Sequence, residues 1–196
     1  MKFILGKKLE MTQVFDEKGK VTPVTLVEAG PCKVLQVKTK KKDGYNAVQL
    51  GFKKKKKNIK KTEKGKEYLF KKEFKSIEEF KLGDEILIDS FKEGDNVKIS
   101  GISKGKGYQG GVKRWGFSGR GASHGVKHEA RTLGSVGSAF PQRVQKGRKM
   151  PGRTGFQRKT IKNLKVIRVD KERNLLAISG ALPGRRGTLL EIRSSD

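Results

Sequence analysis

The chain has few of the residues that build disulfides, metal sites and nucleophilic active sites. It contains one cysteine and two histidines in 196 residues. The single cysteine, Cys32, cannot form an internal disulfide, which is consistent with a reducing compartment. His124 and His128 are four positions apart, but Cys32 is the only other soft ligand and lies far away in the sequence, so a closed zinc site is not expected. We therefore expect no metal ion in this protein.

Long apolar segments are also missing. Only 33% of the residues are hydrophobic, and no run approaches the roughly 18 residues that a membrane-spanning helix needs. The N-terminal segment MKFILGKKLEM holds too few apolar residues for a secretory signal. No long amphipathic helix with a bulky apolar face is predicted, which disfavours a membrane surface as partner. These absences predict a cytoplasmic protein without membrane contact.

Acidic residues are scarce. Twenty Asp and Glu stand against 47 Lys and Arg, and the formal net charge is +27. A chain with this charge repels itself unless a polyanion binds it, and nucleic acid is the obvious candidate. Paired carboxylates for acid–base catalysis cannot be inferred, and no serine or cysteine lies in a recognisable nucleophile elbow. We expect no enzymatic activity, no cofactor and no small-molecule substrate.

The apolar residues are concentrated in short segments rich in Val and Thr and separated by turn-forming residues. The segments are FILG, QVF, VTPVTLVEA, CKVLQVKT, NAVQLGF, EILIDSF, NVKISGI, LKVIRVDKERNLLAISGAL and TLLEIRS. This pattern predicts about eight short strands. Short strands at this spacing usually close into a barrel or a sandwich, because an open sheet would expose its edges. The sequence therefore predicts a mainly β protein.

A lysine-rich tract interrupts the predicted strands at residues 53–75. It holds twelve lysines, three glutamates and no arginine. A solvated loop and a direct RNA contact are equally compatible with it, since a lysine tract gives attraction without direction. Ser76 followed by Glu79 resembles a capping box and predicts a short helix before Gly83. The insertion is thus expected at about 53–82.

A second basic segment, residues 101–160, differs in composition. Its fourteen Lys and Arg face one acid, Glu129, and it contains fourteen of the 25 glycines. With so few aliphatic residues it cannot bury enough apolar surface to compensate its ordering entropy, so we expect it to be largely disordered when alone in water. The chain is predicted to divide into a β body, residues 1–100 and 161–196, and an extension, residues 101–160.

Two glycine patterns in the extension are similar to phosphate-binding loops. GKGYQG matches the dinucleotide pattern G-x-G-x-x-G, with Glu129 about twenty positions later. That site needs a helix after the third glycine, and the glycine-rich sequence that follows predicts none. GRKMPGRT nearly matches the G-x-x-x-x-G-K-[ST] loop, but Arg153 replaces the lysine and Pro151 distorts the loop. We predict neither an oxidoreductase nor an NTPase.

The same residues suit contact with RNA. Glycines let backbone amides approach phosphates closely, and arginine, whose twelve copies all lie between Arg114 and Arg193, binds phosphate bidentately. Interspersed aromatic rings can stack on unpaired bases, although Trp115 and Phe117 could equally anchor the extension on the barrel. The histidines suit contacts with phosphate or base. The side chains predicted to bind RNA are Lys104, Lys106, Tyr108, Lys113, Arg114, Trp115, Arg120, His124, Lys127, His128, Arg131, Arg143, Lys146, Arg148, Lys149, Arg153, Arg158 and Lys159.

Several segments resemble one known family. GISKGKGYQG, KRWGF and SHG closely resemble the signature of the ribosomal large-subunit protein three family in its bacterial form. Five further segments resemble parts of that family and occur along the chain in the family's order: GKKLEMTQVF, DGYNAVQLGF, LGSVG, KGRKMPGR and VIRVDKERNLLAISGALPG. Independent matches along nearly the whole chain are far more specific than one glycine motif.

The resemblance implies a closed β-barrel of the translation-protein type, a small α+β insertion and a long irregular basic extension directed toward the peptidyl transferase centre, with its innermost part around residues 133–148. It also implies binding to large-subunit (23S-type) rRNA, a role in early assembly, contact with ribosomal proteins fourteen and nineteen, and a cytoplasmic location in the ribosome. The alternative is a nucleoid or DNA-architectural basic protein. That class would share the charge, but no dimerising helix or heptad is present in the sequence.

Overall fold

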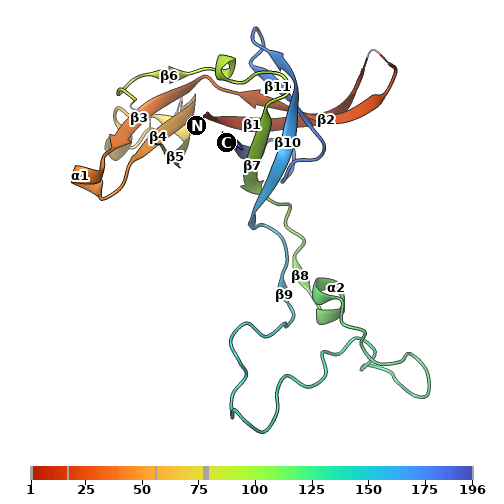
Figure 1. Cartoon of the computed structure of the whole chain (residues 1–196). Helices are drawn as coiled ribbons and strands as arrows, with labels where there is room; N and C mark the ends of the chain where they lie inside the picture. Colours follow the sequence, from red (N-terminus) through yellow and green to blue (C-terminus); the bar gives the residue numbers. More distant parts are fainter. Residues whose placement is uncertain (1, 17, 56, 77–79, 196) are drawn as a thin grey trace. The chain divides into compact units, whose positions relative to one another are not determined.

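The computed structural model describes residues 2–16, 18–55, 57–76 and 80–195 (Figure 1). The chain forms two compact units, which we call the body (Met1–Ser103 with Arg158–Asp196) and the arm (Lys104–Gln157). The strands are β1 (Phe3–Phe15), β2 (Val21–Ala29), β3 (Cys32–Lys38), β4 (Ala47–Lys54), β5 (Tyr68–Lys75), β6 (Glu85–Ile86), β7 (Asn96–Ile102), β8 (Tyr108–Gln109), β9 (Gly152–Arg153), β10 (Arg158–Asp170), β11 (Leu175–Ser179) and β12 (Leu189–Ser194). The helices are α1 (Lys40–Asp43) and α2 (Gly111–Trp115), with 3-10 turns at Lys61–Glu63 and Ile88–Ser90.

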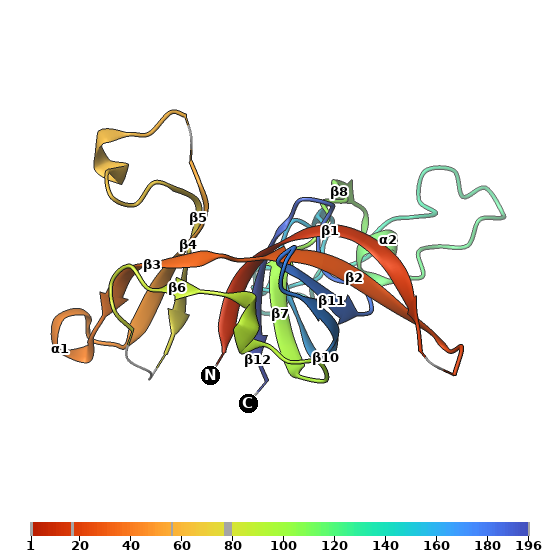
Figure 2. The same ribbon diagram turned by 90° about the horizontal axis from the view of Figure 1, so that it is seen from above.

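Six strands of the body form a sheet that closes on itself (Figure 2). They pair antiparallel in the order β1, β12, β7, β10, β11, β2, and β2 pairs again with β1. In register, Ile192 of β12 lies between Ile4 of β1 and Ile99 of β7, and all three side chains are fully buried. Closure gives each of the six strands a neighbour on both sides over part of its length, whereas residues 13–15 of β1 pair with β2 alone.

The body also contains an open sheet in the order β5, β4, β3, β6. The rings of Phe3 on β1 and Phe74 on β5 stack with centroids 4.8 Å apart, and Phe80 lies 5.5 Å from Phe3. The guanidinium of Arg193 on β12 lies over the other side of this cluster, 4.7 Å from the Phe74 ring centroid. Residues of both sheets therefore share one apolar core.

The prediction of a mainly β protein is confirmed, but several elements differ from the sequence-based expectation. FILG and QVF belong to one thirteen-residue strand, β1. EILIDSF was expected to be a strand, and this was wrong. It holds only the two-residue β6 followed by a 3-10 turn in which Ile88 enters the core, so its apolar residues serve packing rather than pairing.

Within the lysine-rich tract the structure contains a full strand, β5, that the charge pattern concealed. Its apolar residues Phe70 and Phe74 are four apart and both pack on the core, as the two-residue repeat of a strand allows. Between them Lys72 is exposed, while Lys71 and Glu73 are half-buried. The short helix expected from Ser76 and Glu79 falls on residues 77–79, which lie outside the described residues.

Over the described ranges, no helix is both long and apolar enough to cross a membrane.

Candidate nucleic-acid interface

The arm has almost no interior. None of the buried apolar side chains lies between residues 104 and 157, all of which are described, and the one buried residue there is Gly111. By sequence, the arm carries twelve Lys and Arg and one acid, Glu129. The order that it has comes from hydrogen bonds and a few close contacts between half-buried or exposed groups.

Near its root, the arm is a narrow two-stranded ladder. The Lys106 amide donates to the Thr154 carbonyl and the Thr154 amide donates to the Gly107 carbonyl, both at 2.9 Å. The ladder continues as β8 and β9, where Tyr108 pairs with Arg153. Gly155 has a φ of +75°, and a Cβ at this position would overlap the Lys104 carbonyl oxygen, so the close crossing of the two segments requires glycine.

A short helix, α2, follows the GKGYQG segment, and the prediction that no helix follows it was wrong. The helix begins after Gly110 and ends at Gly116, which has a left-handed φ of +76°. A Cβ on Gly111 would lie 2.9 Å from Leu133 Cδ1 and 3.1 Å from Phe117 Cδ2. This close apolar packing fixes the first turn despite the weak helix propensity of glycine.

The helix does not make GKGYQG a dinucleotide site. That site requires a strand, the glycine turn and a helix within a unit of parallel strands. Here the strand before the motif, β7, pairs antiparallel with β10 and β12, and two residues of the motif itself form β8, which pairs antiparallel with β9. The helix itself is five residues long.

Two side chains of α2 donate hydrogen bonds to the segment of the arm around Met150. The Arg114 Nη1 and the Trp115 Nε1 both donate to the Met150 carbonyl, at 2.7 and 2.9 Å. The Arg114 guanidinium lies 4.9 Å from the Trp115 ring centroid, and the Lys149 ammonium lies 5.8 Å from it. A cation over an aromatic face is attracted by the ring quadrupole. Trp115 thus has an anchoring contact within the arm.

The single carboxylate of the arm is already paired. Glu129 forms an ion pair with Arg120, and the Arg120 amide donates to the Ala130 carbonyl at 3.1 Å. At Gly119, with a φ of +72°, a Cβ would overlap that same carbonyl oxygen. The remaining Lys and Arg side chains of the arm have no carboxylate within the arm to pair with. Their charge is available to an outside polyanion.

Two comparisons of sequence converge on one family. A family model described as "Ribosomal protein L3" matches residues 49–182. A "Large ribosomal subunit protein uL3" of Carboxydothermus hydrogenoformans is 48% identical over 99% of this chain and 97% of the relative. Proteins of the same description from Finegoldia magna and Syntrophotalea carbinolica are 47% and 50% identical, over 100% and 99% of this chain and 98% of each relative. The chain belongs to the ribosomal protein L3 family.

Membership in the L3 family confirms several expectations from the sequence. The family is structural and not enzymatic, its members are ribosomal, and in bacteria they are cytoplasmic. It also favours the ribosomal interpretation over a nucleoid or DNA-architectural protein. The resemblance drawn from the glycine-rich motifs was therefore correct.

In this L3-family chain the predicted RNA-binding side chains belong to both units. Arg158 and Lys159 are on strand β10 of the body, and Arg158 forms an ion pair with Glu191 of β12. Arg120 pairs with Glu129, while Arg114, Trp115 and Lys149 are brought together around Met150. The remaining predicted residues are exposed along the arm: Lys104, Lys106, Tyr108, Lys113, His124, Lys127, His128, Arg131, Arg143, Lys146, Arg148 and Arg153.

The two histidines are not part of a metal cluster in the described structure. Both are exposed, and His124 has a left-handed φ of +56°. Within the described ranges, no group of three or more His, Cys, Asp and Glu side chains is placed to hold a metal ion.

Two of the interspersed aromatic rings expected to stack on bases, Phe140 and Phe156, are strongly exposed. Phe140 is 78% exposed and Phe156 is 62% exposed. The Arg153 guanidinium lies 5.5 Å from the Phe156 ring centroid. Both phenylalanines stand among cations in a segment without a core, so stacking on bases stays a prediction for both.

In the lysine-rich tract, part of the positive charge is neutralised internally. Glu63 accepts from the ammonium groups of Lys55 and Lys71, at 3.0 and 3.2 Å. These hydrogen bonds, with one from the Lys60 amide, lower the pKa of the Glu63 carboxyl to about 2. Lys66 donates to the Gln36 side-chain oxygen at 2.6 Å. Some lysines of the tract thus contact the open sheet. The other lysines are compatible with both a solvated loop and a direct RNA contact.

Proposed function

We propose that this protein is a structural constituent of the large ribosomal subunit that binds large-subunit rRNA through its arm. The exposed cations of the arm neutralise phosphates, and the release of counterions supplies much of the binding free energy. The observation that carries this proposal is the arm itself, which has twelve Lys and Arg, one acid that is already paired, and no buried apolar side chain.

The physical mechanism is scaffolding. The body has a continuous apolar core and a closed sheet, so it can fold without RNA. The arm must lose its chain entropy when it binds, and phosphate contacts compensate that loss. The protein contributes positioning, and the chemistry of peptide transfer stays with the RNA.

The remaining expectations from the family resemblance belong to the same proposal. We propose that the closed sheet is the translation-protein-type barrel, that residues 133–148 support the region of the peptidyl transferase centre, and that the protein acts early in subunit assembly. Ribosomal proteins fourteen and nineteen are its proposed neighbours. The family membership and the names of the relatives support a place in the large subunit.

A comparison of two polyanions tests the proposal. The full chain is titrated with folded fragments of large-subunit rRNA and with duplex DNA of equal length at the same salt concentration. We expect tighter binding to at least one rRNA fragment, since an irregular arm fits a folded RNA rather than a uniform duplex groove. The matched control lacks residues 104–157 and should lose this preference. Equal affinity for RNA and DNA would contradict the proposal.

A further inference from the structure

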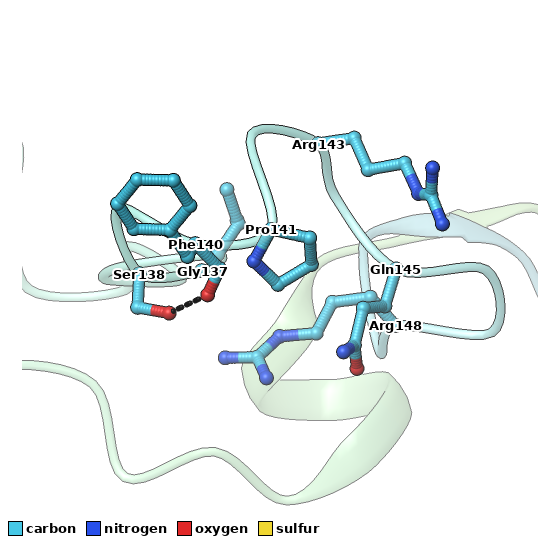
Figure 3. Close-up of a pocket in the computed structure, with 8 residues that line it drawn as sticks. Gly137, Ser138, Phe140, Pro141, Arg143, Gln145 and Arg148 are labelled. Atoms are coloured by element: carbon cyan, nitrogen blue, oxygen red, sulfur yellow. Dashed lines mark hydrogen bonds between the residues drawn. The ribbon is translucent and has the colours of Figure 1, made fainter.

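A hollow of about 270 Å³ lies in the distal part of the arm (Figure 3). It is formed by a single stretch of chain and is partly open to solvent, and it is lined by Val136, Gly137, Ser138, Phe140, Pro141, Arg143, Gln145 and Arg148. Known small-molecule pockets are about 300–1,000 Å³ in volume. The hollow lies just below this range, so its size suits one small ligand at most.

Local hydrogen bonds give this hollow a defined wall. The Ser138 hydroxyl donates to the Phe140 carbonyl at 2.6 Å, which is the dashed line in Figure 3. The Arg148 Nη2 donates to the Ser135 carbonyl at 3.2 Å, and the Arg148 amide donates to the Gln145 carbonyl at 3.3 Å. These bonds use one of the five N–H donors of the Arg148 guanidinium and leave the others for a ligand.

The lining combines three chemical groups. Phe140 presents a ring that is 78% exposed, whereas Trp115 and Phe156 each have a cation over the ring. Arg143 and Arg148 present two guanidinium groups, and no carboxylate lines the hollow. Gln145 adds an amide that can both donate and accept hydrogen bonds.

A nucleotide matches all three groups. An unpaired base stacks on an exposed aromatic face, guanidinium groups bind phosphate bidentately, and an amide can pair with the polar edge of a base. An acidic peptide would use the two arginines but would leave the aromatic face and the amide without a partner. A base still stacked in a helix cannot present its face to a ring, so the ligand must be unpaired.

We propose that this hollow holds one unpaired nucleotide of the rRNA, with its base on Phe140 and its phosphate between Arg143 and Arg148. Gln145 contacts the edge of the base and gives the site preference among bases. This inference rests on the proposed function, because the nucleotide belongs to the RNA that the arm binds.

The test is ultraviolet crosslinking of the full chain in complex with folded large-subunit rRNA, followed by mass spectrometry of peptides that carry a nucleotide. Crosslinking at zero length requires direct contact, which a base stacked on a ring provides, so we expect one nucleotide attached at Phe140. Phe140→Leu should abolish this adduct and weaken binding by about fivefold to a hundredfold, the range of one base–aromatic stack. The matched control is Val144→Ala, an exposed apolar residue of the same loop that does not line the hollow, and it should change neither.

A second pair of variants separates a phosphate contact from general attraction. Arg143→Gln and Lys146→Gln each remove one charge from the same loop, but only Arg143 lines the hollow. Both should weaken binding through salt-dependent attraction, and only R143Q should reduce the yield of the Phe140 adduct. As an independent readout, acylation of ribose 2′-hydroxyls should identify one unpaired nucleotide that is protected in the wild-type complex and becomes reactive with F140L but not with V144A.

The outcomes distinguish this inference from the proposed function. If the wild-type chain does not prefer rRNA, both fail. If it binds rRNA and forms crosslinks elsewhere in the arm, but neither an adduct nor a protected nucleotide responds to F140L, the inference alone is overturned. An adduct with an acidic peptide of another ribosomal protein in assembled particles would indicate a protein partner instead.

Discussion

Glu191 shows how one carboxylate can organise several cations of the body. Its side chain is only 11% exposed, forms an ion pair with Arg158, and lies 3.7 Å from the Lys72 ammonium and 3.9 Å from the Arg193 guanidinium. These cations come from β10, β5 and β12, so the carboxylate connects the closed sheet with the open one. Removal of its charge would leave three nearby cations that repel one another.

Glu191→Gln should therefore destabilise the body while preserving the shape of the side chain. We expect a loss of about 1–2 kcal/mol in the free energy of unfolding, less than for a fully buried pair because the three cations are partly exposed. Urea unfolding followed by circular dichroism measures this change. Glu172→Gln, at an exposed position, is the matched control and should change stability by less than about 0.5 kcal/mol. Equal effects of the two substitutions would contradict the assigned role.

Cys32 gives the body a pH dependence of known sign. The thiol is fully buried and donates to the Leu5 carbonyl, and burial raises its pKa from 9.0 to about 12. Between these values the unfolded chain loses the thiol proton while the folded chain keeps it, so stability falls as pH rises above 9. The stability advantage of wild type over Cys32→Ala should shrink by up to about 1.4 kcal/mol per pH unit there. A difference that stays constant from pH 8 to pH 10 would contradict this.

At the scale of elements, the sequence predicts the strands better than the connections. Runs such as VTPVTLVEA and NVKISGI became β2 and β7, because alternating apolar residues and flanking turns both favour a strand. The helix α2 could not be predicted, since its glycine start packs against Leu133, which is distant in sequence, as well as against the nearby Phe117. Strand β5 was missed because lysines at exposed positions hid its apolar residues.

The sequence predicts which segment carries the candidate site but not how its side chains are paired in space. Excess charge and glycine content identified the arm segment, and these depend on composition alone. Which cations are already paired depends on geometry. Arg120 and Arg158 looked like the others in the sequence, yet each has a carboxylate partner in the structure. The hollow around Phe140 likewise results from the folding of its own loop.

Glu63 organises the lysine-rich tract, and its removal should loosen that element. Its pKa of about 2 results from hydrogen bonds with Lys55, Lys71 and the Lys60 amide. A lowered carboxyl pKa means that these contacts are fully present above the ordinary value of 4.5 and are lost as pH falls through 2. At neutral pH, Glu63→Gln should accelerate cleavage of this tract by a lysine-specific protease, measured by mass spectrometry. The matched variant Glu67→Gln should leave the cleavage rate unchanged.

The arm should be ordered only with RNA. It has one buried residue, a glycine, and its hydrogen bonds are accessible to water. In the free full chain, we expect backbone amides of residues 104–157 to exchange with solvent within seconds, while amides of β1, β7 and β12 stay protected. Addition of folded rRNA should slow exchange in the arm. Protected amides throughout the arm of the RNA-free protein would contradict this expectation and would weaken the proposed mechanism.

At the scale of the whole molecule, the order of the strands delays closure of the sheet until synthesis of the chain is nearly complete. The closed sheet places β12, near the C-terminus, between β1 and β7. During synthesis the sheet therefore cannot close until the entire arm has been made. Pairing between segments so distant in the sequence is slow. Until the sheet closes, the basic chain can bind other polyanions non-specifically or aggregate. Early binding of the arm to rRNA would prevent this non-specific binding.

The distribution of charge predicts how affinity for RNA responds to salt. Each cation that replaces condensed counterions on duplex-like RNA contributes about −0.9 to the slope of the logarithm of the binding constant against that of the salt concentration. Lys127→Gln, in the arm, should make this slope shallower by roughly that amount, because Lys127 is exposed and the sole arm carboxylate is paired with Arg120. Lys171→Gln, in the body, is the matched control. Lys171 already forms an ion pair with Asp89 at 3.3 Å, so its loss should leave the slope nearly unchanged. Binding measured between 50 and 300 mM KCl gives both slopes. If affinity does not depend on salt, phosphate neutralisation is not the source of binding, and the arm must hold RNA by another interaction.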